Sequence, residues 1–387
     1  MAKLGEVCTI VSGSTPKTSV TSYWDGNIKW ITPAELNEDT FYIMDSVRHI
    51  TEEGKEKTGL SYLPTGTVIL SSRAPIGKTA IAGCKMCCNQ GFKNLICSDA
   101  IYNEYLYFFL KSKTDYLNSL GRGATFKEIS KSIVENIEIP LPEVNQQKEI
   151  AEKFKKLEQL ISLRKQQLAK LDELVKARFV EMFGDPADNV NNLPASPMTA
   201  ICQIIDGDRG KNYPKQEEFS DSGFCLFLNA KNVTAQGFSF ENCTYITEEK
   251  DALLRNGKLC RGDVVLTTRG TIGNLAFYDT SVPYENTRIN SGMVILRMNK
   301  QVVSEIFFIE QFKMQLDSIK SRIASGSAQP QLPISTMNKI EMILPPIELQ
   351  NQFAAFVERV SQQKQTVQQS LEKLELMKKA LMQEYFG

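Results

Sequence analysis

Residues 146–181 read QQKEIAEKFKKLEQLISLRKQQLAKLDELVKARFVE, a stretch with neither glycine nor proline. From Ile150 to Met182, positions taken alternately four and three residues apart are apolar in eight of ten cases. Such a heptad pattern is typical of a long helix that packs against another long helix. We therefore predict one continuous helix over 146–181. Its apolar seam consists of Ile150, Phe154, Leu157, Ile161, Leu168, Leu171, Val175 and Met182, interrupted by Arg164 and Arg178.

The same seam returns when 203 is added to each residue number. Eight of these ten positions are again apolar: Phe353, Val357, Val360, Val367, Leu371, Leu374, Leu381 and Tyr385, interrupted by Lys364 and Lys378. Because one chain carries both helices, the simplest way to bury both seams is an antiparallel coiled coil within the chain. Pairing between two chains, which would give a homodimer, is the alternative.

The rest of the chain also contains an internal repeat, in which Cys8–Gly13 recurs as Cys202–Gly207 and Leu63–Leu70 recurs as Leu259–Leu266. In both copies an arginine then precedes an Ile-Gly pair: Arg73 with Gly77 and Arg269 with Gly273. Short β-rich runs at 67–71 and 292–296, and a helical segment at 103–113, lie between glycine and proline residues. This pattern predicts two α+β globules, each followed by one long helix.

Composition limits the classes of function. A chain of 387 residues with no net charge and a pI of about 6.7 is not an indiscriminate polycation, so any contact with nucleic acid requires local clustering. Residues 57–98 form one such cluster, with five basic residues and no acid: Lys57, Arg73, Lys78, Lys85 and Lys93. There is no apolar run of membrane-spanning length, and the start MAKLGEVCTIVSG does not resemble a signal peptide. We therefore expect a cytoplasmic protein with reduced cysteines.

Other motifs were weighed for catalysis or metal binding. Cys84, Cys87, Cys88 and Cys97 could ligate zinc, but the second copy has no cysteines at these places, which favours free thiols. The only histidine, His49, cannot anchor a histidine-based site alone. Ile76–Thr79 imitates the end of a P-loop without its first glycine, so it does not predict nucleotide binding. We recognise no methyltransferase, cofactor-binding or nuclease motif.

The doubled motifs resemble the specificity subunit of type I restriction-modification enzymes. The resemblance covers almost the whole chain, and the doubled order of its elements is more specific than any one of them. The motifs that carry the resemblance are the segment Ile137–Pro142 followed by the helix start Gln146–Ile150, and the second helix start Leu349–Phe353. The others are the turns Arg73–Lys78 and Arg269–Asn274 and the Gly-rich loops Gly121–Lys127 and Gly326–Gln331.

The resemblance implies two pseudo-two-fold related target-recognition domains, 1–142 and 186–345, separated by two spacer helices, 143–185 and 346–387. Each domain would read half of a bipartite DNA target, and the helices would set the unread spacer and dock the methyltransferase subunits. Two methyltransferase subunits and restriction/translocase subunits would assemble around this non-catalytic chain. S-adenosylmethionine, ATP and Mg²⁺ are expected on those partner subunits only. The recognised bases do not follow from the sequence.

Candidate DNA contacts lie in the loops. Arginine suits phosphate groups and guanine edges, and Gly-rich loops with hydrogen-bond donors suit a DNA backbone. The set is Lys17, Arg73, Lys78, Lys93, Arg122, Thr125, Lys127, Arg209, Lys211, Arg269, Asn274, Arg288, Gln329 and Gln331. A structural ion pair is the alternative for the arginines, and an ordinary connector is the alternative for the loops. Two other functions compete: a coiled-coil adaptor with two protein-binding globules, and a self-contained enzyme that would need catalytic motifs.

Overall fold

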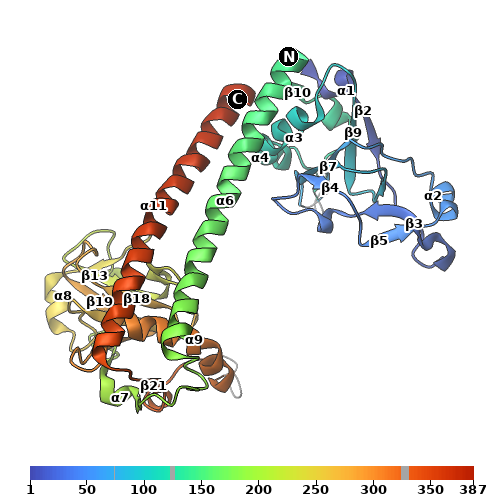
Figure 1. Cartoon of the computed structure of the whole chain (residues 1–387). Coiled ribbons are helices and arrows are strands. Elements are labelled where there is room, and N and C mark those ends of the chain that lie inside the picture. Colours follow the sequence, from blue (N-terminus) through green and yellow to red (C-terminus); the bar gives the residue numbers. More distant parts are fainter. Residues whose placement is uncertain (74, 123–126, 324–330) are drawn as a thin grey trace. The chain divides into compact units, whose positions relative to one another are not determined.

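The computed structural model describes residues 1–73, 75–122, 127–323 and 331–387 (Figure 1). The chain divides into two compact units. Unit 1 comprises Met1–Gln166 and Gln368–Gly387, and unit 2 comprises Gln167–Val367. The long helices α6 (Val144–Phe183) and α11 (Ile347–Phe386) therefore contribute residues to both units. The helix predicted over 146–181 is confirmed, as is its counterpart near the C-terminus.

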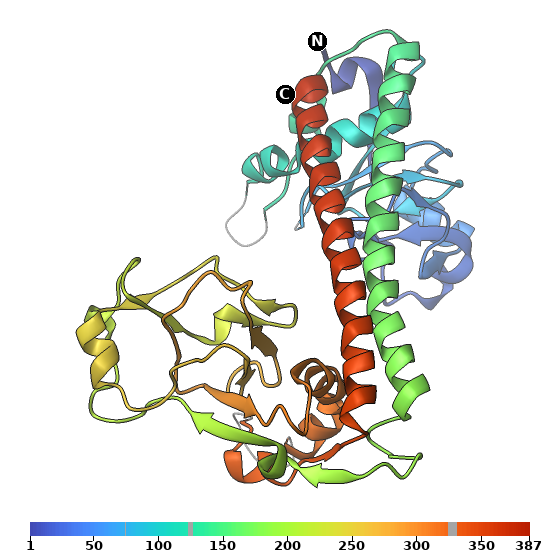
Figure 2. The ribbon, with the colours of Figure 1, turned by 60° about the vertical axis from the view of Figure 1, so that its left-hand side comes forward.

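The two long helices pack against each other within each unit (Figures 1 and 2). In unit 1, the ring of Phe154 near the start of α6 stacks on that of Phe386 at the end of α11, with 5.6 Å between centroids. In unit 2, Phe179 near the end of α6 meets Phe353 near the start of α11 at 5.3 Å. The start of each helix thus lies beside the end of the other. Antiparallel pairing within one chain is confirmed, and a homodimer is not needed to bury the seam.

The predicted seam is the buried face of this helix pair. Of its sixteen apolar positions, nine are buried and the other seven are half-buried. The buried ones are Ile150, Phe154, Leu157, Ile161, Val175, Phe353, Val360, Val367 and Leu371, and the half-buried ones are Leu168, Leu171, Met182, Val357, Leu374, Leu381 and Tyr385.

Three of the four polar interruptions of the seam have partners on the opposite helix. Arg164 Nε donates to Ser370 Oγ at 3.2 Å and Lys378 Nζ donates to Glu158 Oε1 at 2.7 Å in unit 1, and Lys364 Nζ donates to Asp172 Oδ1 at 2.5 Å in unit 2. Arg178 pairs instead with Glu181 of its own helix. These partners keep the cost of placing polar side chains in the seam low.

Unit 1 contains a five-stranded sheet in the order β2-β9-β6-β7-β4 and a three-stranded sheet in the order β5-β3-β8. In β6 all four residues are buried, because the strand lies inside the sheet and both of its faces are covered. The strands are β2 (Cys8–Ser12), β3 (Trp24–Ile31), β4 (Tyr42–Ile43), β5 (Arg48–Ile50), β6 (Val68–Ser71), β7 (Thr79–Ala82), β8 (Cys87–Cys88) and β9 (Phe92–Cys97). A short pair, β1 (Ala2–Lys3) with β10 (Glu138–Ile139), joins the two ends of the globule.

Unit 2 contains corresponding sheets in the orders β12-β20-β17-β18 and β16-β13-β19, and its larger sheet has four strands where that of unit 1 has five. In both units the middle strand of the smaller sheet is antiparallel to one neighbour and parallel to the other. The strands are β12 (Cys202–Asp206), β13 (Cys225–Leu228), β16 (Tyr245–Ile246), β17 (Asp263–Thr267), β18 (Leu275–Tyr278), β19 (Thr287–Ile289) and β20 (Met293–Met298). Two short pairs complete it: β11 (Ala195–Pro197) with β21 (Glu341–Ile343), and β14 (Val233–Thr234) with β15 (Gly237–Phe238).

The remaining helices are short apart from α9. They are α1 (Leu4–Val7), α2 (Glu52–Thr58), α3 (Asn103–Ser112), α4 (Thr114–Ser119), α5 (Lys131–Glu135), α7 (Met198–Ile201), α8 (Glu248–Leu253), α9 (Glu305–Ile323) and α10 (Ile334–Met337). The 3-10 helices are η1 (Thr21–Tyr23), η2 (Pro33–Glu35), η3 (Gln216–Glu218) and η4 (Ala230–Asn232). Within the described residues, no helix is long and apolar enough to span a bilayer.

The last aromatic residue of each long helix is a core residue that the heptad register missed. Phe183 packs on Phe307 of α9 with 5.1 Å between ring centroids, and Phe386 packs on Tyr105 of α3 at 5.2 Å. Both phenylalanines are at most 2% exposed. Each long helix therefore follows one globule in sequence and ends in the core beside the other globule's helix.

We predict that Phe386→Ala costs unit 1 about 3–5 kcal/mol of unfolding free energy, because it removes a buried ring and leaves a cavity beside Tyr105 and Phe154. The two tryptophans of the chain, Trp24 and Trp30, both lie in unit 1, so tryptophan fluorescence during urea unfolding reports on that unit. The control Leu376→Ala removes a side chain that is 68% exposed and should change stability by less than about 0.5 kcal/mol. Equal effects of the two substitutions would contradict the role of Phe386.

Candidate nucleic-acid interface

The same tight turn follows the inner strands β6 and β17. In unit 1, the Gly77 N–H donates to the Ser71 carbonyl oxygen at 3.0 Å, and in unit 2 the Gly273 N–H donates to the Thr267 carbonyl oxygen at 3.0 Å. The two glycines have φ of 96° and 95°, in the left-handed region that favours glycine. The repeated Arg…Ile-Gly motif is therefore one backbone structure used twice, and in both units the arginine before the turn is exposed.

The residue after each turn, Lys78 or Asn274, is half-buried and hydrogen-bonds to the backbone of its own globule, and its contact with DNA stays a prediction. Lys78 Nζ donates to the Leu36 carbonyl oxygen at 2.6 Å. Asn274 Nδ2 donates to the Val233 carbonyl oxygen at 2.9 Å. Leu36 and Val233 directly follow η2 and η4, so the two side chains tie equivalent helical turns to the sheet.

Arg73 takes part in an ionic cluster. Its Nε donates to Glu128 Oε2 at 2.8 Å, and Lys93 Nζ donates to Glu128 Oε1 at 3.1 Å. The Arg73 side chain is 46% exposed, whereas that of Lys93 is only 8% exposed. Burial alone would raise the pKa of Glu128, but the hydrogen bonds from Arg73 and Lys93 outweigh it and lower this pKa below its usual value. Lys93 is therefore a buried partner of Glu128, an arrangement that argues against the prediction that it contacts DNA.

Arg269 occupies the same place without an ion pair. Its backbone bridges to Gln331, as that of Arg73 bridges to Glu128. The strand register places Val294 opposite Leu266, in the position that Lys93 takes opposite Leu70. Within the described residues, Arg269 forms no ion pair, and both it and Gln331 are exposed. The second globule therefore has a neutral pair where the first has Lys93 and Glu128.

The first Gly-rich loop begins and ends beside Arg73. Arg122 and Glu128 exchange two backbone hydrogen bonds, of 3.0 and 2.9 Å, which close the loop between them. Arg122 and Lys127 are exposed at its base, so the structure brings three cationic side chains to the same end of the sheet. Thr125 and Gln329, which were also predicted to contact DNA, lie outside the described residues.

The loop after the first sheet strand carries the remaining predicted contacts. Lys17 in unit 1 and Lys211 in unit 2 are exposed. Arg209 is partly held, because one of its terminal nitrogens donates to Asp206 Oδ1 at 3.1 Å. Buried Asp208 fixes this loop by accepting hydrogen bonds from the Gly210 and Arg255 N–H groups, both at 2.7 Å.

Arg288 is a core residue, and its burial and internal partners argue against the prediction that it contacts DNA. The residue is 5% exposed. Its guanidinium pairs with the Asp251 carboxylate and donates to the carbonyl oxygens of Asn256 at 2.8 Å and Leu254 at 3.1 Å. In the parallel strand pairs, Arg288 lies opposite Phe227 and Cys87 lies opposite Trp30, so buried Cys87 is the counterpart of Arg288 in unit 1. The position is therefore charged in one globule only.

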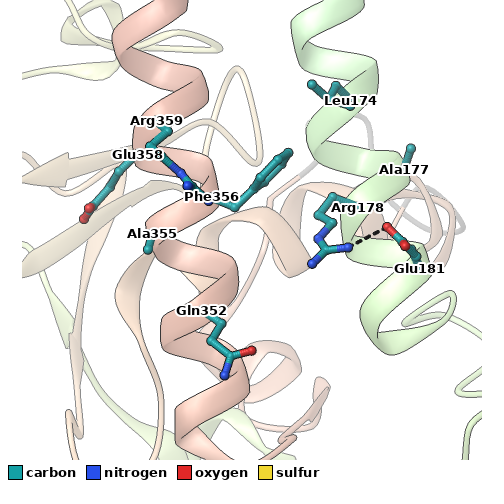
Figure 3. A pocket seen from close by; sticks show the side chains of 9 residues that line it. All are labelled: Leu174, Ala177, Arg178, Glu181, Gln352, Ala355, Phe356, Glu358 and Arg359. Atoms are coloured by element: carbon teal, nitrogen blue, oxygen red, sulfur yellow. Dashed lines mark hydrogen bonds and ion pairs between the residues drawn. The ribbon is translucent and has the colours of Figure 1, made fainter.

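The helix pair has a groove in unit 2, between the end of α6 and the start of α11, with a volume of about 1130 Å³ (Figure 3). Leu174 and Ala177 line one wall, and Phe356 projects from the other. The ion pair of Arg178 with Glu181 lies at its rim, with 2.8 Å between the paired atoms. The surface is apolar with a charged edge, which is a composition suited to protein contact.

The equivalent positions in unit 1, obtained through the shift of 203, are more polar. Lys153 stands for Phe356 and Glu152 for Ala355, and both line a smaller pocket of about 570 Å³ beside α3. The two faces of the helix pair therefore differ in chemistry although their backbones correspond.

The cysteines of the first globule have separate partners. Cys88 Sγ accepts a hydrogen bond from Asn94 Nδ2 at 3.0 Å, and Cys84 Sγ donates to the Met44 carbonyl oxygen at 3.2 Å. Among the described residues there is no group of three or more His, Cys, Asp and Glu side chains placed to share a metal ion. His49 lies 3.5 Å from Asp45 and is half-buried.

Glu128 is the site residue that the sequence analysis missed. It is separated from Gln331 by the same 203 residues that relate the two long helices, and it directly follows the Gly-rich loop. The sequence shows that this repeated position is acidic in one copy and neutral in the other. It does not show the ion pairs of Glu128, because Arg73 and Lys93 are 55 and 35 residues away in the chain.

Comparisons with known proteins agree with this arrangement. A family model described as the type I restriction modification DNA specificity domain matches residues 1–173 and 198–376. The type I restriction enzyme MjaIX specificity subunit of Methanocaldococcus jannaschii is 29% identical over 381 residues, which cover 92% of this chain and 85% of that protein.

Two solved structures share the fold. The S subunit of a type I restriction-modification system from M. genitalium has a TM-score of 0.57 at 17% identity, over 100% of this chain and 95% of that one. A chain from work on complex assembly and conformational transition of the type I R-M system has a TM-score of 0.63 at 16% identity, over 100% and 96%.

The fold, with its doubled α+β globule and its long helices, is therefore that of type I S subunits. The family model covers most of the chain, so the protein belongs to the type I restriction-modification DNA specificity family. It is a specificity subunit with two target-recognition domains, the non-catalytic part of a complex in which it binds DNA and partner subunits. Membership of this family favours the role of a DNA specificity subunit over the two alternatives, a coiled-coil adaptor protein and a self-contained enzyme.

The placement of Arg288 generates a prediction about stability. Arg288→Ala should lower the unfolding free energy of unit 2 by about 3–5 kcal/mol, because it leaves the buried Asp251 carboxylate without its main partner. Circular dichroism should then show an early transition while tryptophan fluorescence, which reports on unit 1, keeps its midpoint. Lys211→Ala, at an exposed position of the same unit, serves as the control. A stable Arg288→Ala protein with weakened DNA binding would restore Arg288 as a DNA contact.

Proposed function

We propose that each globule reads one half of a bipartite, asymmetric double-stranded DNA target, with residues 1–142 and 186–345 as the two target-recognition domains. The observation that carries this proposal is the doubled turn, whose equivalent backbone geometry exposes Arg73 in one globule and Arg269 in the other. A side chain kept in both globules, while the loops around it differ, suits a contact common to both half-sites. The sugar-phosphate backbone is that common feature, and the arginine fork fits phosphate oxygens.

Specificity then comes from exposed residues that differ between the globules. In the first globule these are Lys17, Arg122 and Lys127, and in the second Arg209, Lys211 and Gln331. Base contacts depend on such donors and acceptors in the grooves, whereas phosphate contacts fix the position of the protein on the duplex.

We further propose that the helix pair, residues 143–185 and 346–387, sets the number of unread base pairs and docks two methyltransferase subunits. The apolar groove lined by Leu174, Ala177 and Phe356 supports a docking role, because such a surface favours contact with a protein. Restriction/translocase subunits join the same assembly in the cytoplasm, and S-adenosylmethionine, ATP and Mg²⁺ bind to these partners.

The phosphate assignment makes a prediction for Arg73→Ala and Arg269→Ala. Each substitution should weaken binding to matched and mismatched duplexes alike and reduce the slope of log K against log salt by about one unit. The matched duplex follows from mapping methylated adenines in cells that express the chain with its partners. Binding isotherms at several salt concentrations supply both quantities.

A different outcome would reassign the arginine. If Arg73→Ala relaxes preference at one base pair and leaves the salt slope unchanged, Arg73 reads sequence. Lys127→Ala is the comparison, since a residue of a divergent loop should alter base preference, by about 1–3 kcal/mol for each base pair read.

The spacer role predicts the effect of shortening both helices together. Deleting the opposed residues 163–169 and 366–372 removes one heptad from each helix and keeps the seam in register. The helix pair becomes about 10 Å shorter, which corresponds to about three base pairs of duplex. The methylated motif should keep both half-sites and have a shorter unread spacer. An unchanged spacer in a folded, active variant would refute the proposal that the helices set this distance.

A further inference from the structure

Glu128 is held in place by its backbone as well as by its ion pairs. Its N–H and C=O pair with Arg122, and the next residue, Ile129, donates its N–H to the Ser72 carbonyl oxygen at 2.9 Å. Its carboxylate is consequently fixed relative to the strand that ends just before Arg73. Buried Lys93 occupies one carboxylate oxygen and leaves the other for the guanidinium.

The ion pair uses only one edge of Arg73. The bond to Glu128 is made by Nε, and within the described residues neither terminal nitrogen of Arg73 donates to another group. The two terminal nitrogens are the ones that form a bidentate contact with a phosphate. The Arg73 side chain is 46% exposed, so a guanidinium held by Nε leaves these two nitrogens without a partner among the described residues.

The second globule has no counterpart of the Arg73–Glu128 ion pair among the described residues, although the net charge at the equivalent positions is the same. Arg73, Lys93 and Glu128 carry two positive charges and one negative charge, which leaves +1. Arg269, Val294 and Gln331 also sum to +1. The equivalent places therefore differ in how the arginine is held and not in their charge.

We propose that Glu128 is a positioning residue that orients Arg73 for contact with the DNA backbone, so that the first globule has an arginine preorganised by an ion pair, which Arg269 of the second lacks among the described residues. This inference rests on the proposed function of Arg73. Lys93 supports the arrangement by neutralising the carboxylate from the interior. Because ordering a long side chain on binding weakens affinity, loss of the restraint should cost about two- to tenfold in affinity.

The double variant K93V/E128Q tests this by giving the first globule the residues of the second. It removes Lys93 together with its partner Glu128, so no buried charge is left unpaired and the net charge is unchanged, while exposed Arg73 loses its ion pair. With the full chain and a random-sequence duplex as probe, we expect the dissociation constant to rise by about two- to tenfold. The salt slope and the midpoint of tryptophan-monitored unfolding should stay close to those of the parent.

The Arg73→Ala background separates positioning from a merely structural role. If Glu128 acts through Arg73, K93V/E128Q should cause no further loss of affinity when Arg73 is already alanine. An equal loss in both backgrounds would overturn the proposal, as would unchanged affinity in the parent background. K93M/E128Q, which preserves more of the lysine stem, replaces the first variant if valine leaves a destabilising cavity.

The same set of proteins distinguishes this inference from the proposed function. If Arg73→Ala weakens binding but K93V/E128Q does not, only the positioning role fails. If Arg73→Ala leaves binding and its salt dependence unchanged, the phosphate contact itself fails, and the positioning role fails with it.

Discussion

Burial of the two heptad seams against each other is the constraint on which the rest of the structure depends. Each seam runs along a helix of 40 residues that carries charged residues on its other faces, so neither helix can bury its apolar side alone. Antiparallel packing solves this and also brings the ends of the helices into the two globular cores. There Phe183 and Phe386 complete aromatic clusters that contain Phe307 and Tyr105. The helix pair and the globules are therefore stabilised by the same contacts.

The two globules keep one backbone and vary its charged interior. Buried Lys93 is neutralised by Glu128 in the first, where the second has Val294 and Gln331. The second instead buries Arg288, paired with Asp251. An unpaired charge in either interior would cost several kcal/mol, so such charges can be gained or lost only with their partners. Each of these buried charges has its partner within the same globule, and the exposed arginine of the turn is common to both.

Much of this fold follows from periodicity, because a heptad pattern and a doubled set of motifs are local properties of a sequence. The directions of individual side chains do not follow in the same way. Lys78 lies in a basic, glycine-containing turn, but its acceptor, the Leu36 carbonyl group, is 42 residues away and accepts only because a 3-10 helix ends there. Arg288 has its carboxylate partner 37 residues away. Phe386 lies one residue beyond the seam, so periodicity excludes it although the core requires it. Side-chain contacts that depend on distant partners are therefore the ones that the sequence does not predict.

The aromatic contact of Phe154 with Phe386 also orders events during synthesis. A ribosome adds about 5–20 residues per second, so the second half of this chain emerges tens of seconds at most after the first. Throughout that interval the first globule exists without Phe386, and its Tyr105 and Phe154 rings lack one neighbour. The long loop between the contacting residues adds an entropic cost that grows only slowly with length, so closure remains favourable once the helix is made. The first domain to leave the ribosome is thus the last to be finished, and a chaperone that covers apolar surface would have most to protect there.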